Sequence, residues 1–263
     1  MATRTEQKAQ AREERLARQQ ADEEAARRRR RLLWFGGALL VAVVAVAVVI
    51  AISSSSSSSS GTTGGTAPPK AVASVSRLLG GIPQSGNQLG KASAPVTVTV
   101  YEDLQCPICR DFTLGAENQL IANDVRAGRA KLVFRSLQTA TPDAPTFQAQ
   151  QQAAVAAGKQ QKLWHYVELF YHQQGPEGTG YADSAFLDKL GRQVPGLDQA
   201  AWQRARKTPA VARQVSADQA LAQAKGFNAT PTITVQGPKS SPQPVNGAVD
   251  YATLEGLVKQ AGG

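Results

Sequence analysis

The longest apolar stretch of the chain is residues 32–52, in which 21 consecutive positions carry no charged side chain. A helix of this length spans about 31 Å, close to the thickness of the hydrocarbon core of a bilayer. The pattern therefore predicts a single membrane-spanning helix. A cleaved signal peptide is the alternative, although the apolar region of such a peptide is normally about 7–15 residues long.

The flanks of this stretch predict its orientation. Five consecutive arginines at 27–31 precede it, and a positively charged flank stays in the cytoplasm. We therefore expect residues 1–31 to be a cytoplasmic basic tail and residues 32–52 an uncleaved signal anchor. Residues 53–69 are almost only Ser, Gly, Thr and Pro, which predicts a flexible linker to an extracytoplasmic domain at 70–263.

In the rest of the chain, short runs with strand-like alternation are separated by longer runs with helical spacing of apolar residues. Val alternates with Thr at 96–101, which is typical of a strand. The predicted strands are 96–101, 130–137, 232–235 and a short one near 244–246. The predicted helices are 106–122, five between 145 and 226, and one that follows Asp250. This order predicts an α/β domain with a helical insertion at about 141–226.

Charge and cysteine content narrow the classes of function. The net charge is +9, but residues 1–31 alone hold ten basic and six acidic residues. Elsewhere the basic residues are scattered and are not interleaved with aromatic residues that could stack on bases, so we expect no nucleic-acid partner. Two cysteines in 263 residues exclude a disulfide-stapled scaffold and any cluster that needs four thiolates.

The two cysteines, Cys106 and Cys109, are separated by Pro107 and Ile108 at the start of a predicted helix. Side chains at positions i and i+3 share one helical face, close enough for a disulfide. Unpaired N–H groups at the helix N-terminus stabilise an anion, so Cys106 is the predicted nucleophile, with a lowered pKa. Cys109 lies one turn further in, aligned with Phe112, and is expected to be less exposed and to resolve mixed disulfides.

Metal binding is the alternative use of this cysteine pair. Zinc needs four ligands, and the two histidines, His165 and His172, are seven residues apart on one predicted helix, about 10 Å along its axis. Both therefore cannot complete one tetrahedral site. We expect no metal and no cofactor besides the redox-active disulfide of Cys106 and Cys109, and we expect helix packing or solvent exposure for the histidines.

The segment Tyr-Glu-Asp-Leu-Gln-Cys-Pro-Ile-Cys-Arg at 101–110 resembles the active-site segment of extracytoplasmic DsbA-like thiol:disulfide oxidoreductases. The segment Gly-Phe-Asn-Ala-Thr-Pro-Thr at 226–232 resembles the cis-proline segment of that family, and residues 247–257 resemble its final helix. The resemblance covers about residues 77–260. It implies a thioredoxin fold with an inserted helical domain, here preceded by the single transmembrane helix.

The same resemblance assigns a role to two further residues. It implies that the Thr230–Pro231 bond is cis and lies against the cysteine turn. The backbone of Thr230 is then exposed for pairing with an extended substrate strand. The alternative for Pro231 is a trans proline at the entry of a strand.

Two departures from the family pattern bear on the chemistry. Ile108 stands where the best-known oxidases have His, and its side chain cannot donate a hydrogen bond to a thiolate, so a weaker oxidant is expected. Val100 stands six residues before the first cysteine, where thioredoxins and many relatives have a buried acid. Glu102 and Asp103 lie nearer to the cysteines. Either is a candidate for relaying a proton to or from Cys109, with a structural or solvated role as the alternative.

The function implied by the resemblance is donation of the Cys106–Cys109 disulfide to thiols of exported proteins. A membrane quinone-linked oxidase of the DsbB or vitamin K epoxide reductase kind would then reoxidise the pair. The first alternative is a reductase or isomerase that uses the same site. The second is a tethered binding or chaperone module that uses the Thr230 edge. In each case the sequence predicts a single-pass protein of the cell membrane.

Overall fold

The computed structural model describes residues 69–240 and 244–262. The predicted tail at 1–31, the predicted membrane span at 32–52 and residues 53–68 of the predicted linker lie outside the described residues. Within the described part, none of the helices has the length and apolar character needed to cross a membrane. Helix α2 begins at Pro69, the residue at which the predicted linker ends.

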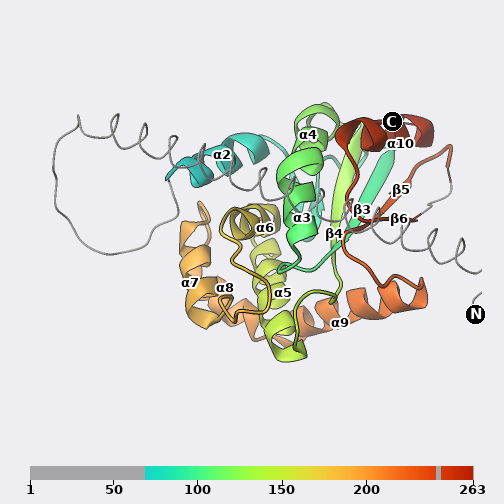
Figure 1. Cartoon of the computed structure of the whole chain (residues 1–263). Coiled ribbons are helices and arrows are strands. Elements are labelled where there is room, and N and C mark those ends of the chain that lie inside the picture. Colours follow the sequence, from blue (N-terminus) through green and yellow to red (C-terminus); the bar gives the residue numbers. More distant parts are fainter. Residues whose placement is uncertain (1–68, 241–243, 263) are drawn as a thin grey trace, which may run out of the picture. The chain divides into compact units, whose positions relative to one another are not determined.

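A mixed sheet with the strand order β1-β2-β4-β3-β5-β6 forms the centre of the domain (Figure 1). Its two central strands, β3 and β4, run parallel, and β5 lies antiparallel to β3 on the other side. The strands are β1 (Gln84–Ser85), β2 (Gln88–Leu89), β3 (Val96–Glu102), β4 (Ala130–Ser136), β5 (Thr232–Gln236) and β6 (Pro244–Asn246). The four strands predicted from the sequence are thus confirmed.

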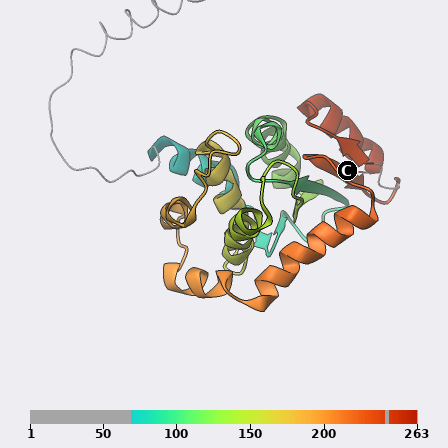
Figure 2. The same ribbon diagram turned by 60° about the horizontal axis from the view of Figure 1, so that its bottom comes forward.

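Helices pack on both faces of this sheet. The helical stretch after the cysteines contacts α10 on one face, where α10 also contacts β5. On the other face Tyr101 of β3 packs with Ala222 of α9, which is the long orange helix in Figure 2. The helices are α2 (Pro69–Leu79), α3 (Pro107–Phe112), α4 (Asn118–Leu120), α5 (Ala144–Gly158), α6 (Leu163–His172), α7 (Ser184–Gln193), α8 (Gln199–Arg206), α9 (Pro209–Ala224) and α10 (Tyr251–Ala261).

The insertion between β4 and β5 consists of α5 to α9, which confirms the five helices predicted there. The starting points of four of these helices follow from local chemistry, because a side-chain oxygen at the N-cap satisfies a backbone N–H that the helix itself leaves unpaired. Asp143, Asp183, Asp198 and Thr208 each accept such an N–H three residues further on. Asp250 caps α10 in the same way, as its position before the final helix predicts.

Two parts of the fold differ from the predictions. Helix α2 and the β1–β2 hairpin form in a region to which the sequence analysis assigns no element. Strands of two residues leave no periodic pattern, whereas the helical spacing of apolar residues in α2 is left unassigned. The helix predicted at 106–122 begins at Pro107 and continues to Val125. It contains two π-helical turns, η1 (Thr113–Glu117) and η2 (Ile121–Val125), which often mark functional sites.

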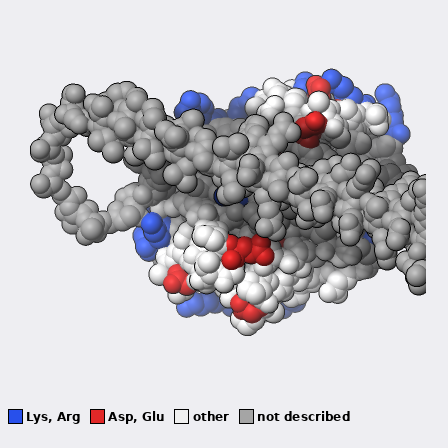
Figure 3. All heavy atoms as spheres, in the orientation of Figure 1, with Lys and Arg blue, Asp and Glu red and all other residues white. Residues whose placement is uncertain are grey.

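Charges of both signs are spread over the described surface. On the face shown in Figure 3, Lys and Arg side chains lie among Asp and Glu side chains.

One partly buried ion pair has a clear structural role. Arg135 of β4 contacts Asp218 of α9 at 2.6 Å, and the backbone N–H of Ser136 donates to the same carboxylate at 3.2 Å. This pair fastens the last helix of the insertion to the end of a central strand.

Candidate active site

Cys106 is the N-cap of α3, at the end of the loop that leaves β3. Its backbone is extended, with φ −69° and ψ 118°, and its Sγ accepts the backbone N–H of Cys109 at 3.4 Å. Pro107 follows at the first helical position, where a missing N–H costs nothing. The backbone N–H of Cys106 donates to the carbonyl of Asp103 at 2.9 Å, which closes the loop beneath the cysteine.

The environment of Cys106 lowers the pKa of its thiol to about 6. The main cause is a hydrogen bond from the side chain of Cys109. Partial burial acts in the opposite direction, but the Thr230 hydroxyl and the backbone N–H groups of Cys109 and Ile108 add to the lowering. Cys106 is therefore mostly a thiolate at neutral pH, which is the reactive form of cysteine.

Cys109 lies in the opposite environment. Burial raises the pKa of its thiol well above the ordinary value, and the hydrogen bond to Cys106 and the charge of Glu102 raise it further. Both cysteines are free thiols in this structure. Cys106 keeps 5% of its surface exposed and Cys109 keeps none, so Cys109 is the deeper of the two, as predicted, although the difference is small.

The second motif lies directly against the first. The Thr230–Pro231 bond is cis, and the carbonyl oxygen of Thr230 lies 3.4 Å from Sγ of Cys106, across 124 residues of sequence. The hydroxyl of Thr230 shares a hydrogen bond with the hydroxyl of Thr139 from the loop after β4. The structure thus brings the Cys106 turn and the Thr230 segment together, as the resemblance implies.

The surface over the cysteine turn is apolar. Ile108 is 52% exposed. It is one of two large hydrophobic side chains that are exposed among the described residues, and the more exposed of the two. Pro107 beside it is exposed as well. An apolar surface next to a reactive thiolate suits a flexible polypeptide better than a small polar substrate, because side chains of the polypeptide can bury this area.

Asp103 holds the loops around the site together. One carboxylate oxygen accepts the backbone N–H of Gln105 at 3.0 Å and the hydroxyl of Thr141 at 2.5 Å. The other accepts three consecutive backbone N–H groups, from Thr139, Ala140 and Thr141, at 3.0, 2.9 and 2.8 Å. Asp103 therefore fixes the loop after β4, whose Thr139 contacts the Thr230 segment.

Glu102 is buried beneath the cysteines and is positioned quite differently. Its carboxylate oxygens accept hydrogen bonds from the hydroxyls of Thr113 at 3.1 Å and Tyr171 at 3.0 Å. Burial raises the pKa of Glu102 to about 8, these two hydroxyls oppose the rise, and the charge of Cys106 adds to it. The charge of Glu102 also raises the pKa of Cys109, so the titration of this carboxyl is linked to that of both thiols.

The sequence analysis left structural, solvated and proton-relaying roles open for both acids. A solvated role is wrong for both, since Glu102 is 1% exposed and Asp103 is fully buried. The five hydrogen bonds of Asp103 give it a structural role. Glu102 is the acid with a raised pKa near Cys109, and it stays a candidate for proton transfer. Val100, at the position of the family's usual acid, is buried among apolar residues.

Several polar residues at the site were not found by sequence reasoning. Tyr171, near the end of α6, also donates to the carbonyl of Asp103, and Gln174 after α6 donates to the carbonyls of Leu104 and Cys106 at 2.8 and 3.1 Å. They come from the insertion, about 70 residues away in sequence, so no local pattern points to them. A weak signal exists for Glu168, which interrupts the apolar run of α6.

Among the described residues, no group of three or more His, Cys, Asp or Glu side chains is arranged to hold a metal ion. The two histidines both lie on α6, seven residues apart, and have different neighbours. Nδ1 of His165 lies 3.1 Å from Nε2 of Gln84, and burial lowers the pKa of His165 to about 4. His172 is exposed at the end of α6.

Comparison with known proteins agrees with this geometry. The family described as Thioredoxin matches residues 84–260, and a family described as an inhibitor of host cell division protein domain matches residues 10–60, all of which lie outside the described residues. A curated relative, the probable disulfide bond formation protein D of Bacillus cereus, is 23% identical over 154 residues, which are 59% of this chain and 71% of that protein. A second, the Na(+)/H(+) antiporter NhaA 1 of Mycolicibacterium gilvum, is 31% identical over 159 residues. This match spans 59% of the present chain but only 24% of the antiporter.

Two solved structures show the same fold over most of the described residues. A thioredoxin-like oxidoreductase from Silicibacter pomeroyi is 27% identical, with a TM-score of 0.53 over 66% of this chain and 90% of that one. Oxidised BdbD from Bacillus subtilis is 21% identical, with a TM-score of 0.58 over 68% of this chain and 97% of that one. The chain therefore belongs to the thioredoxin family, as a DsbA-like thiol:disulfide oxidoreductase.

Proposed function

We propose that this protein is an oxidase that donates the Cys106–Cys109 disulfide to exported proteins outside the cytoplasm. The observation that carries the proposal is the contrast between the two thiols. The pKa of Cys106 is lowered to about 6, whereas burial raises that of Cys109. A thiolate that is stable in the reduced protein makes the disulfide a stronger oxidant and makes Cys106 a good leaving group.

The transfer takes place in two balanced exchanges. A substrate thiol loses its proton to solvent, and the thiolate attacks Sγ of Cys106. The Cys106–Cys109 bond breaks, and Cys109 leaves with the electron pair and takes up a proton. A second substrate thiolate then attacks the substrate sulfur of the mixed disulfide, and Cys106 leaves as a thiolate. The substrate has lost two electrons, and the protein has gained them.

Glu102 is proposed as the group that supplies the proton to Cys109. A thiolate at the buried position of Cys109 is unfavourable, so a nearby acid must give up its proton as the disulfide breaks. The pKa of Glu102, about 8, keeps this carboxyl mostly protonated at neutral pH. In the reverse reaction the same carboxylate removes the proton from Cys109.

The reduced pair must pass its two electrons to another oxidant before the next cycle. We propose a membrane quinone-linked oxidase of the DsbB or vitamin K epoxide reductase kind as that partner. The disulfide bond formation protein among the relatives supports this direction of electron flow. The apolar surface at Ile108 and the adjacent Thr230 backbone would bind both the partner and the substrates in extended form.

The location is proposed from the sequence alone. The uncharged stretch at 32–52 would anchor the protein in the cell membrane with residues 1–31 in the cytoplasm. Intact mass and membrane fractionation of the mature protein test this. We expect the full mass in the membrane fraction. A soluble product that lacks residues 1–52 would contradict the anchor without touching the redox chemistry.

The reduction potential of the cysteine pair tests the direction of the reaction. The full chain is equilibrated with glutathione buffers, and the thiols of Cys106 and Cys109 are counted by alkylation. A potential of about −120 to −180 mV supports disulfide donation, whereas a value near −270 mV favours the reductase. Cys109→Ser is the control, because it keeps the nucleophile but cannot form the internal disulfide. If Cys106→Ser keeps full activity in cells, the protein is a binding module instead.

A further inference from the structure

Three carboxyl groups lie buried together behind the cysteine pair. Glu102 ends β3, Glu117 ends the π-helical turn η1, and Glu168 lies in the middle of α6. Glu117 and Glu168 are fully buried. Within the described part of the chain, neither oxygen of Glu117 has a hydrogen-bond partner, and Oε2 of Glu168 has none either. Carboxyl groups that only support the fold, such as Asp103, are normally satisfied by hydrogen bonds.

Among the described residues, no basic side chain is one of the groups that act on these acids. The groups that act on Glu102 are Tyr171, Thr113 and Cys106, and those that act on Glu117 are Glu102, Glu168 and Thr113. Asn118 and Glu102 act on Glu168. Without a cationic partner, a buried carboxyl avoids its charge by binding a proton. Burial accordingly raises the pKa of Glu102 and of Glu168 to about 8, and it raises the pKa of Glu117 well above its ordinary value.

The three groups form a connected row. The hydroxyl of Thr113 donates to Glu102 and also acts on Glu117, one π-helical turn further along. The charges of Glu102 and Glu168 both raise the pKa of Glu117, which stands between Thr113 and Asn118 in the chain. With its amide oriented to satisfy both partners, Asn118 donates to Oε1 of Glu168 at 2.6 Å and to the carbonyl of Thr113 at 3.2 Å.

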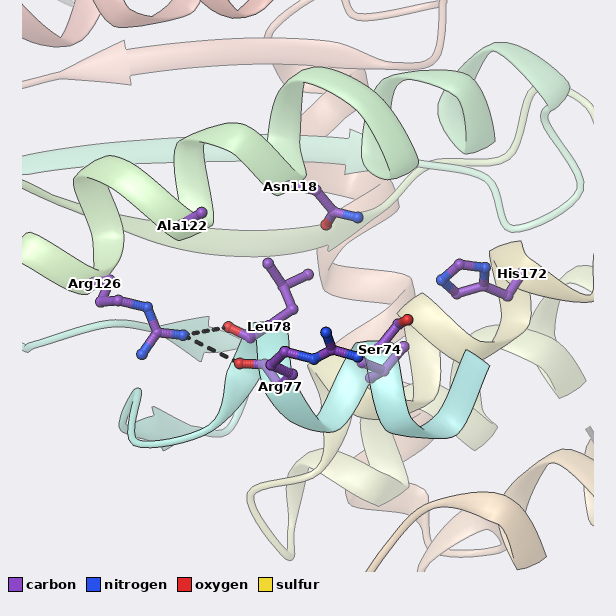
Figure 4. A pocket seen from close by; sticks show the side chains of 8 residues that line it. Ser74, Arg77, Leu78, Asn118, Ala122, Arg126 and His172 are labelled. Atoms are coloured by element: carbon purple, nitrogen blue, oxygen red, sulfur yellow. Dashed lines mark hydrogen bonds between the residues drawn. The ribbon is translucent and has the colours of Figure 1, made fainter. Parts of the chain in front are cut away.

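The far end of this row reaches a solvent-accessible hollow between α2, the α4 segment and the end of α6. The hollow has a volume of about 620 Å³, and Asn118, His172 and Ser74 are among the residues that line it (Figure 4). Figure 4 shows Asn118 on the wall of the hollow opposite α2. Neither the cysteines nor Thr230 line it. Asn118 is therefore the side chain that connects Glu168 to solvent in the hollow. The hollow is separate from the proposed substrate surface at Cys106 and Thr230.

We propose that Glu117 and Glu168 carry protons between Glu102 and this hollow, where Asn118 holds the Glu168 carboxyl beside solvent without carrying a proton itself. The inference rests on the proposed function, in which Glu102 gives a proton to Cys109 and takes one back. Substrate covers the exposed edge at Cys106 during the exchange, so a proton that enters from the other side does not compete with the bound polypeptide. Glu117 and Glu168 act through Glu102 and do not touch the sulfur atoms.

The number of protons released to solvent during one reduction of the Cys106–Cys109 disulfide tests this route. The oxidised full chain is mixed with dithiothreitol in weak buffer at about pH 7.5, above the pKa of Cys106 of about 6. A pH indicator records protons, and quenched alkylation of the two cysteines records reduction. Dithiothreitol releases two protons as it is oxidised, Cys106 stays a thiolate, and Cys109 takes up one proton. We expect the wild-type protein to release one net proton in step with reduction.

Three variants interrupt the row at different points: Glu117→Gln, Glu168→Gln and Asn118→Leu. Each leaves the proton already held by Glu102 available, so the disulfide is still reduced at once. Glu102 then cannot recover its proton quickly. We expect two protons to be released with reduction and one to be taken up in a separate phase, slower by roughly tenfold or more. Glu168→Asp keeps a carboxyl group and should restore the single phase.

Glu255→Gln is the matched control, because Glu255 lies on the surface of α10 beside Lys259. It should behave as the wild type. Asn118 is only partly buried, so Asn118→Leu keeps the test decisive if a buried Glu→Gln variant fails to fold. The proton route is wrong if the release of one net proton stays in step with reduction in every folded variant. If no reducible Cys106–Cys109 disulfide forms in the wild type, it is the proposed function that fails.

Discussion

Cys106 and Cys109 are one helical turn apart, yet the regions on their two sides differ in almost every physical property. On the outer side, Cys106 meets backbone N–H groups, the Thr230 segment and the exposed side chain of Ile108. On the inner side, Cys109 meets the buried carboxyl of Glu102 and no solvent. The same side chain is therefore a thiolate in one region and a neutral thiol in the other.

This difference separates two tasks of disulfide exchange. Sulfur–sulfur bonds form and break at the outer side, where a thiolate is stable and a polypeptide has access. Protons are gained and lost at the inner side, where the low dielectric makes a charged sulfur unfavourable. The two neighbouring acids show the same division. The five hydrogen bonds of Asp103 make it a structural element, whereas Glu102, held by two hydroxyls, can bind and release a proton.

The reactivity of the two thiols gives the largest expected effect. When the reduced protein is treated with iodoacetamide at neutral pH, Cys106 should react at least about a hundredfold faster than Cys109, because only thiolates react. The rate at Cys106 should be half-maximal near pH 6, the pKa lowered by the Cys109 hydrogen bond. Peptide mapping of the alkylated protein measures both rates. In denaturant the two rates should become similar. Equal rates in the folded protein would contradict the difference in pKa between Cys106 and Cys109.

Loss of the Asp103 carboxylate should have the next largest effect. Asp103→Ala leaves four buried or partly buried backbone N–H groups without their acceptor, which should lower the free energy of unfolding by about 3 kcal/mol or more. Urea unfolding measures the change. Asp111→Ala is the control, because the Asp111 side chain is exposed and pairs only with Arg110. If Asp103→Ala lowers the free energy of unfolding no more than the control does, Asp103 has no structural role.

The buried acids should make stability depend on pH. Burial raises the pKa of Glu168 from 4.5 to about 8, so its contribution to stability is complete below about pH 4.5 and is lost as the pH rises through 8. Glu168→Gln removes this loss. The stability gained over the wild type should therefore grow between pH 4.5 and 8, by on the order of 1 kcal/mol for each unit of pKa shift at most.

Thermal unfolding of the oxidised proteins across this pH range measures that effect, and the oxidised form excludes titration of Cys106. Glu255→Gln serves again as the surface control and should show no trend with pH. A gain for Glu168→Gln that is the same at pH 5 and pH 8 would show that Glu168 is ionised in the folded protein.

The smallest expected effect concerns the outer side. Ile108→His adds a hydrogen-bond donor next to Cys106, where isoleucine has none. The pKa of Cys106 should fall further, and the disulfide should become more oxidising, by about 30 mV for each tenfold change in the exchange equilibrium. Glutathione equilibration measures the shift, with Ile108→Leu as the control for side-chain volume. An unchanged potential would mean that the backbone and Cys109 alone set the pKa of Cys106.

The sequence predicts the parts of this site that depend on local spacing. Two cysteines three residues apart at a helix start must share a helical face, and the apolar spacing of Cys109 and Phe112 predicts which side is buried. The alternation of Val with Thr gives the strand that ends beside them. Capping residues such as Asp143 and Asp250 mark where helices begin. Each of these patterns acts over one or two turns of chain, so each is visible in the sequence.

The inner side of the site depends on contacts that no local pattern encodes. Glu102 is enclosed because the hydroxyls of Thr113 and Tyr171 donate to it, and Asp103 becomes structural because three N–H groups of the loop after β4 converge on it. The π-helical turn that faces Glu117 inward leaves no mark in the sequence. The sequence by itself determined the identity and order of the two cysteines. Only the tertiary structure decided where the protons of Cys109, Glu102, Glu117 and Glu168 reside, because burial raises the pKa of each of these groups.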